Sequence, residues 1–133
     1  MKNKILLILF LILIITTFSA CTSKNDSSVS DYTKISAKEA KEMMDKESAI
    51  TILDVRTEEE YNTSHIEGAI LLPDTDILEK AEETLTDKSA TILVYCRSGR
   101  RSALAAADLV ELGYTNVYDF GGIIDWNYDI VTE

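Results

Sequence analysis

Short apolar runs without polar alternation recur along the chain and restrict its fold more than any other feature. Such runs are typical of strands that are buried on both faces. Helical patterns separate them, and two open with a capping box, in which Ser or Thr precedes Glu by three residues. We therefore predict an α/β fold with a parallel β-sheet flanked by helices on both faces. The predicted strands span residues 49–55, 69–72, 91–95 and 116–119, and the predicted helices follow Ser36 and Thr57, begin at Asp76, and span residues 100–112.

Two of the predicted helices carry an apolar face that should pack on the sheet. These faces are Ala37, Ala40, Met43 and Met44 in the first helix, and Ile77, Leu78, Ala81 and Leu85 in the third. Gly113 is expected to end the fourth helix, because glycine readily adopts the left-handed conformation found after many helix C-termini.

The first 20 residues are predicted to be a secretory signal peptide, because two lysines precede an apolar core at residues 5–15. This core is short for a membrane-spanning helix, which disfavours an uncleaved anchor. Phe18-Ser19-Ala20-Cys21 resembles a bacterial lipobox, whose cysteine is acylated and becomes the new N-terminus. Cleavage to a soluble protein is the other alternative, but Phe18 stands where a small residue is preferred.

A lipid on Cys21 would attach the protein to the outer face of a bacterial cell membrane without a spanning helix. Residues 21–31 are then the lipidated N-terminus and a flexible, polar tether. Residues 32–133 remain as one folded domain.

The charge of the chain excludes some classes of partner. The formal net charge is −10, and removal of residues 1–20 leaves 11 Lys and Arg against 23 Asp and Glu, about −12. Such an acidic chain is not expected to bind nucleic acid. His65 is the only histidine, so no metal cluster can be built around it, and we expect neither a metal nor another cofactor.

The segment at residues 96–102 reads CRSGRRS and follows a predicted strand at the start of a helix. In such a turn successive backbone N–H groups point into one concavity, and the helix N-terminus adds positive charge. With three arginines nearby, a thiol here should have a lowered pKa and react as a thiolate. The same groups should bind a small oxyanion, so nucleophile and anion site coincide. The alternative is a structural loop whose cysteine happens to end a strand.

We therefore assign Cys96 as the candidate nucleophile. The candidate substrate-binding residues are Arg97, Ser98, Gly99, Arg100, Arg101 and Ser102. If Cys21 is acylated, Cys96 has no disulfide partner in the chain.

Four separated motifs resemble those of the rhodanese family, the thiosulfate sulfurtransferases. They are the loop at 96–102, Asp54-Val-Arg56 with Glu60-Tyr61, His65-Ile-Glu-Gly-Ala69, and Gly121-Gly-Ile-Ile-Asp-Trp126. Ser64 departs from the family pattern, which usually has glycine before the histidine. The resemblance spans roughly the whole folded part.

The resemblance implies sulfur transfer through a persulfide on Cys96. A small anionic donor such as thiosulfate, or a polysulfide or persulfide, gives the sulfur, and a thiol or cyanide accepts it. Arg97 and Arg101 are the candidates for contacting the departing oxyanion, and Ser102 for bonding the sulfur or capping the helix.

Other residues of these motifs are expected to have supporting roles. Asp54 and Arg56 should fix loops near the site, with Arg56 and Glu60 as a possible surface ion pair. Within the family the position of His65 is structural. Trp126 is expected in the core rather than as a lid, and Gly121 and Gly122 in a tight turn beside the loop.

Two other functions stay open at this point. One is a non-catalytic persulfide carrier or sulfide-binding module, which needs the same cysteine. The other is a small phosphatase or arsenate reductase, whose loop has five residues between cysteine and arginine. Here Ser102 stands six residues after Cys96, so the loop is one residue too short for that pattern.

Overall fold

The computed structural model describes residues 32–132. The predicted signal peptide, the lipidation site Cys21 and the tether lie outside the described residues. No helix within residues 32–132 has the length and apolar character needed to cross a membrane.

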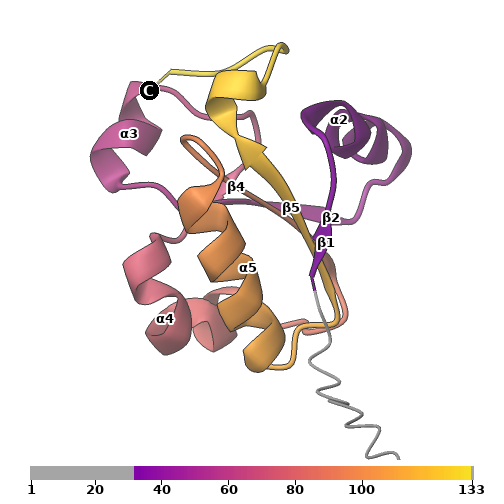
Figure 1. Cartoon of the computed structure of the whole chain (residues 1–133), viewed down its shortest axis with the longest axis vertical. Coiled ribbons are helices and arrows are strands. Elements are labelled where there is room, and N and C mark those ends of the chain that lie inside the picture. Colours follow the sequence, from indigo (N-terminus) through magenta and orange to yellow (C-terminus); the bar gives the residue numbers. More distant parts are fainter. Residues whose placement is uncertain (1–31, 133) are drawn as a thin grey trace, which may run out of the picture.

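Five parallel strands form one sheet in the order β1-β5-β4-β2-β3, which confirms the predicted fold class (Figure 1). In chain order the elements are β1 (Thr33–Lys34), α2 (Ala37–Lys46), β2 (Ile50–Asp54), α3 (Glu58–Thr63), β3 (Ile70–Leu71), η2 (Asp74–Asp76), α4 (Ile77–Thr84), β4 (Thr91–Cys96), α5 (Arg100–Glu111), β5 (Asn116–Gly122) and η3 (Ile123–Asp125). Helix α2 lies on one side of the sheet, and α4 and α5 lie on the other (Figure 1).

Both predicted capping boxes are present at the N-termini of helices. The Ser36 hydroxyl accepts from the Glu39 N–H at 3.2 Å, and the Glu39 carboxylate accepts from the Ser36 N–H at 2.8 Å. Thr57 and Glu60 make the same two bonds at α3. Each box supplies partners for backbone donors that a helix leaves free, which is why these local patterns begin helices reliably.

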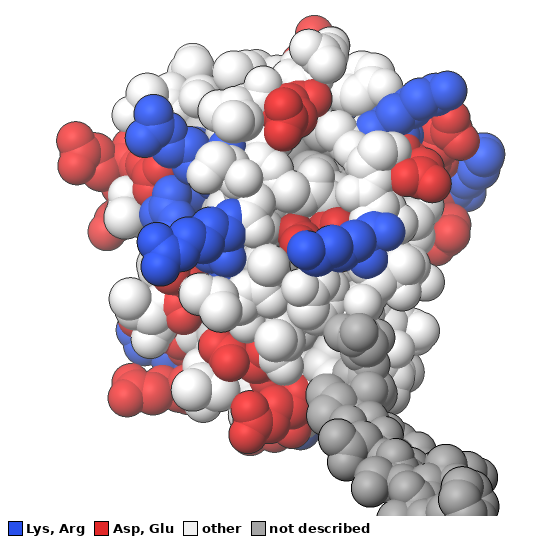
Figure 2. Space-filling model, in the orientation of Figure 1, with Lys and Arg blue, Asp and Glu red and all other residues white. Residues whose placement is uncertain are grey.

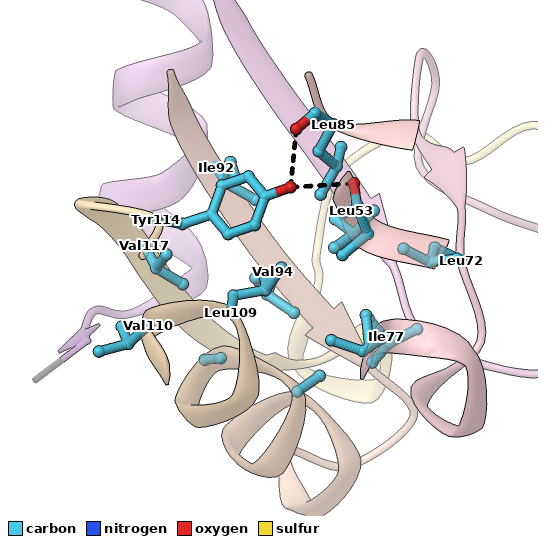
Figure 3. Close-up of a cluster of buried hydrophobic side chains, with 14 of the residues drawn as sticks. Leu53, Leu72, Ile77, Leu85, Ile92, Val94, Leu109, Val110, Tyr114 and Val117 are labelled. Atoms are coloured by element: carbon cyan, nitrogen blue, oxygen red, sulfur yellow. Dashed lines mark hydrogen bonds between the residues drawn. The ribbon is translucent and has the colours of Figure 1, made fainter. Parts of the chain in front are cut away.

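The core has one part on each face of the sheet. Beneath α4 and α5, Tyr114 is fully buried and its hydroxyl donates toward the carbonyl oxygens of Ala81 and Leu85, at 2.9 and 2.7 Å (Figure 3). On the opposite face, the predicted apolar residues of α2 pack with Trp126, which is 8% exposed as expected of a core residue. Burial on both faces holds β4 rigidly at the centre of the sheet, where the candidate loop begins.

Several sequence predictions need correction. Leu78 is 60% exposed, because α4 turns Ile77, Ala81 and Leu85 toward the core and leaves Leu78 to one side. The predicted start of the third helix is confirmed, since Asp76 is the N-cap of α4, although its side chain makes no capping hydrogen bond and instead accepts from Lys80 at 2.6 Å.

Strand boundaries also differ from the predictions. The strand predicted at residues 69–72 has only two residues, Ile70–Leu71, and β5 continues three residues beyond residue 119. The short edge strand β1 was not predicted, because two residues give no periodic signal.

Candidate active site

Cys96 is the last residue of the central strand β4, and α5 begins four residues later (Figure 1). The turn between them needs Gly99, which is the N-cap of α5 and has a left-handed φ of +95°. The loop therefore lies at the carboxyl edge of the sheet, where parallel α/β folds bind their ligands. Arg97, Ser98 and Arg100 are exposed at this edge, and Arg101 is half-buried.

The Cys96 sulfur faces inward and only 1% of the residue is exposed. The Gly99 N–H donates to the sulfur at 3.0 Å, and the Ser102 hydroxyl oxygen lies 3.6 Å from it. Ser102 is fully buried and also donates to the Gly121 carbonyl at 3.3 Å. Ser102 thus contacts the sulfur, while Gly99 rather than Ser102 is the N-cap of the helix.

The pKa of Cys96 is lowered, in the direction that the sequence predicts. Burial of the sulfur by itself raises the pKa, but hydrogen bonds from Ser102, Gly99 and Ser98 outweigh it. The cause is therefore the cradle of hydrogen-bond donors more than the arginine charges. A thiol in such a cradle is a thiolate at lower pH than a free cysteine, and the thiolate is the reactive form.

The segment at the end of β5 supports the loop from beside it. A Cβ placed on Gly122 would lie 2.4 Å from the Arg97 carbonyl oxygen and 2.6 Å from the Ser98 Cα, so a larger residue would force the loop backbone to shift. Gly121 has a φ of +88°, and the Ile124 N–H donates to the Arg97 carbonyl at 3.3 Å. Gly121 and Gly122 lie beside the loop as predicted, but they belong to β5, where its register with β4 shifts between Val94 and Cys96, and not to a tight turn.

Asp54 and Arg56 form a buried ion pair below the loops, with side chains no more than 5% exposed. Arg56 Nη2 donates to Asp54 at 2.6 Å and also to the Ser64 carbonyl at 2.6 Å. The Tyr95 hydroxyl donates to Asp54 at 2.6 Å and accepts from the Ile66 N–H at 3.1 Å. This network ties β2, β4 and the segment after α3 together. Tyr95 was missed, because nothing local distinguishes it from the rest of its strand.

The predicted ion pair between Arg56 and Glu60 does not form. Glu60 instead binds Arg101, whose Nη1 and Nη2 donate to the two carboxylate oxygens at 2.8 Å each. This contact lowers the pKa of Glu60 to about 2 and raises that of Arg101. The capping box indicated where the Glu60 carboxylate lies, but it could not predict that its ion-pair partner is 41 residues away.

Within residues 32–132, neither Arg97 nor Arg100 takes part in an ion pair. Figure 2 shows a group of Lys and Arg side chains on the upper left of the molecule, with acidic side chains at its border. Figure 1 places the loop between β4 and α5 in this region. The protein is therefore locally basic around the loop although its net charge is −10.

A pocket of about 300 Å³ borders the loop. Its lining residues are Arg56, Glu59, Glu60, Thr63, Ser64, Arg97, Ile123 and Ile124. A larger cavity of about 620 Å³ lies between α2 and the C-terminal segment, and no residue of the 96–102 loop lines it. The smaller pocket lies beside Arg97, the residue that follows Cys96, and Cys96 itself is not among its lining residues.

His65 has structural contacts in the described part of the chain. Its ring stacks on Tyr61 at a centroid distance of 3.8 Å, and Nδ1 lies 3.0 Å from the Tyr61 carbonyl oxygen. Its backbone pairs with Val131. Among residues 32–132, no three His, Cys, Asp or Glu side chains are grouped so as to hold a metal ion.

A parallel sheet with a cysteine held in a cradle of hydrogen-bond donors at the end of its central strand defines the class of α/β fold to which this chain belongs. The rhodanese-like domain model matches residues 36–129, and the chain belongs to this family. It is 41% identical over 73 residues to thiosulfate sulfurtransferase PspE of Escherichia coli, covering 55% of this chain and 70% of that protein. It is 38% identical over 96 residues to thiosulfate sulfurtransferase GlpE of Coxiella burnetii, covering 71% and 87% respectively.

Another relative has a different description. The chain is 34% identical over 106 residues to putative sulfur carrier protein YrkF of Bacillus subtilis, and the match covers 79% of this chain but only 55% of that protein. Among solved structures, a rhodanese with anions from E. coli matches with a TM-score of 0.60 and 38% identity, over 64% of this chain and all of that one. The relatives named here thus include both thiosulfate sulfurtransferases and a putative sulfur carrier protein.

Proposed function

We propose that this protein is a sulfurtransferase that moves sulfane sulfur from a small donor to a thiol or cyanide through a persulfide on Cys96. The observation that carries the proposal is the cradle around the sulfur: the Gly99 N–H at 3.0 Å, Ser102 at 3.6 Å and a lowered pKa. These donors stabilise negative charge on sulfur, and both the thiolate and the persulfide carry that charge. The similarity to thiosulfate sulfurtransferases supports sulfur as the transferred atom.

In the first half-reaction the Cys96 thiolate attacks the outer sulfur of thiosulfate. An S–S bond forms on Cys96, the S–S bond of thiosulfate breaks, and sulfite leaves with the electron pair. In the second half-reaction cyanide or a thiolate attacks the outer sulfur of the persulfide, and the Cys96 thiolate is restored. A covalent intermediate shared by two half-reactions gives ping-pong kinetics.

The loop residues have separate roles in this mechanism. The backbone N–H groups of Ser102, Gly99 and Ser98 and the hydroxyl of Ser102 stabilise the negative charge on the sulfur. Arg97 and Arg100 attract the anionic donor from solvent, and Arg101 interacts electrostatically with Cys96. Asp54 and Arg56 act indirectly, because they hold the segments that surround the pocket.

The test is a thiosulfate:cyanide assay on the purified protein, with Cys96→Ser beside it. We expect thiocyanate formation by the wild type and none by the variant. Peptide mass spectrometry after thiosulfate treatment should find one added sulfur on Cys96 and none on Cys21. If sulfane donors leave Cys96 unmodified, the sulfur-transfer proposal is wrong.

A persulfide carrier is the second candidate, favoured by the similarity to putative sulfur carrier protein YrkF. A carrier forms the same persulfide but releases sulfur only to a dedicated partner. A stable persulfide on Cys96 without turnover toward cyanide or small thiols would identify the carrier. Steady turnover with either acceptor would identify the enzyme.

We also propose that a lipid on Cys21 anchors the protein to the outer face of a bacterial membrane. The support is the signal-like segment followed by the lipobox-like residues before Cys21. Growth with a radiolabelled fatty acid should label the wild type but not Cys21→Ala. An unlabelled protein that is released to the medium would refute the anchor.

A further inference from the structure

The Glu60–Arg101 pair changes the charge balance expected at the mouth of the site. Of the loop's three arginines, Arg101 already has a carboxylate on both terminal nitrogens, at 2.8 Å each. The two side chains are 28% and 29% exposed, so solvent only partly screens the pair. One of the three positive charges is therefore largely cancelled within the protein.

Thr57 also holds the Glu60 carboxylate in place. Oε2 also accepts from the Thr57 N–H at 3.1 Å and from the Thr57 hydroxyl at 3.2 Å. The capping box of α3 thus fixes the carboxylate that binds Arg101, and a rigid element supports the pair.

The pocket beside the loop is balanced in charge as well. Its charged lining residues are Arg56 and Arg97 against Glu59 and Glu60, and Arg56 is itself paired with Asp54. The exposed apolar side chain of Ile124 completes one wall. A pocket of about 300 Å³ with balanced charge and an apolar wall has room for a small organic molecule as well as for a compact inorganic anion.

We propose that Glu60 determines the charge preference of the Cys96 site, because it neutralises Arg101 and so disfavours strongly anionic reactants. The substrate class in this proposal rests on the proposed function. The preferred reactants are organic persulfides and thiols of low net charge, such as zwitterionic amino-acid thiols. Dianionic thiosulfate is then a usable but less favoured donor. Glu60 acts through Arg101 and the local field, without contact with the transferred sulfur.

The experiment compares alkylation of Cys96 by anionic iodoacetate and by neutral iodoacetamide in the full-length protein. Both reagents react with the thiolate, so their rate ratio is independent of the Cys96 pKa and reports the charge felt by the reagent. Peptide mass spectrometry separates Cys96 from Cys21. This measurement needs no sulfur transfer.

Glu60→Gln keeps a side chain that can complete a capping box but removes its charge. We expect the iodoacetate-to-iodoacetamide ratio to rise about threefold to tenfold, the effect of one unit charge within a Debye length. Glu39→Gln is the matched control, because it makes the same change in the capping box of α2, and it should leave the ratio unchanged.

Two further variants test neutralisation against a purely structural role. Arg101→Gln leaves the carboxylate unpaired and should lower the ratio below that of the wild type, whether or not Glu60→Gln folds. The double variant Glu60→Gln/Arg101→Gln restores the wild-type net charge, and its ratio should return close to the wild-type value. A ratio that is unchanged or lower in Glu60→Gln, or that stays high in the double variant, would overturn the proposal.

Turnover then tests the substrate class. The value of kcat/KM for thiosulfate should rise severalfold in Glu60→Gln, while that for cysteine persulfide should not. Equal rises for both donors would overturn the proposed preference. If the alkylation ratio responds as expected but no persulfide ever forms on Cys96, the sulfur chemistry fails and the charge role of Glu60 stands.

Discussion

Replacement of Gly122 by alanine should push the backbone of the Cys96 loop out of place. The backbone of Gly122 has φ −110° and ψ 144°, which any residue adopts, so the substitution adds no backbone strain. The new Cβ, however, would lie 2.4 Å from the Arg97 carbonyl oxygen, 2.6 Å from the Ser98 Cα and 2.9 Å from the Arg97 carbonyl carbon. All three atoms are backbone, so no side chain can rotate away.

The size of the effect follows from this overlap. The loop must retreat by about 1 Å to restore ordinary van der Waals separation. Such overpacking costs about 1–3 kcal/mol, or about 5–20 °C in Tm for a domain of this size. A displacement of about 1 Å in a reacting group reduces turnover by about 100-fold. Since the Gly99 and Ser98 donors move with the loop, the pKa of Cys96 should also rise.

Three measurements on Gly122→Ala test this reasoning: thermal unfolding, thiosulfate:cyanide turnover, and the pH dependence of thiolate absorbance at Cys96. Gly68→Ala is the control, because Gly68 has a φ of +79° and a Cβ there would meet nothing within 4 Å. The control should lose about 1 kcal/mol of stability through strain and keep the Cys96 pKa and turnover. Wild-type stability, pKa and turnover in Gly122→Ala would refute the argument.

Three other substitutions test separate parts of the structure. Asp54→Asn leaves the buried Arg56 guanidinium without its counterion and should destabilise the fold by about 3–5 kcal/mol in urea unfolding; a loss below about 1 kcal/mol would contradict that role. Glu60 has a folded pKa of about 2 against an ordinary 4.5, so its stabilisation is complete above pH 4.5 and lost as the pH falls toward 2. In Glu60→Gln the free energy of unfolding should fall less between pH 4.5 and pH 2 than in the wild type, and an equal fall would show that the pair contributes nothing. Ser102→Ala removes one donor that lowers the Cys96 pKa but keeps the backbone donor, so the alkylation pH profile should move partway to higher pH; no movement would exclude the hydroxyl as a cause.

Local patterns predicted the secondary structure well where the signal lies within a few residues. The capping boxes at Ser36 and Thr57 are both formed, because their hydrogen bonds join residues three apart. Gly113 follows α5 with a left-handed φ of +93°. Leu78 was misplaced because its helix begins after a 3₁₀ turn, and the phase of a short helix is poorly determined by eight residues.

Pairing across the fold was harder to predict. Arg56 has suitable partners nearby in sequence, and Glu60 is one of them at helical spacing. In the structure Arg56 pairs with Asp54, two residues away, in a buried ion pair, and the partly buried Glu60 and Arg101 are brought together from α3 and α5. Sequence spacing cannot rank such partners, because their distances depend on how β2, α3 and α5 meet.

The sequence by itself determined the α/β class, the position of the candidate nucleophile at the end of a strand, and the resemblance to rhodaneses. These follow from local hydrogen bonding, from apolar periodicity and from motifs of a few residues. Only the tertiary structure decided that hydrogen bonds from Ser102, Gly99 and Ser98 lower the Cys96 pKa, and that Glu60 neutralises Arg101. The physical reason is that these effects depend on distances of about 3 Å between groups, most of them on different elements, and only the packed sheet and helices set those distances.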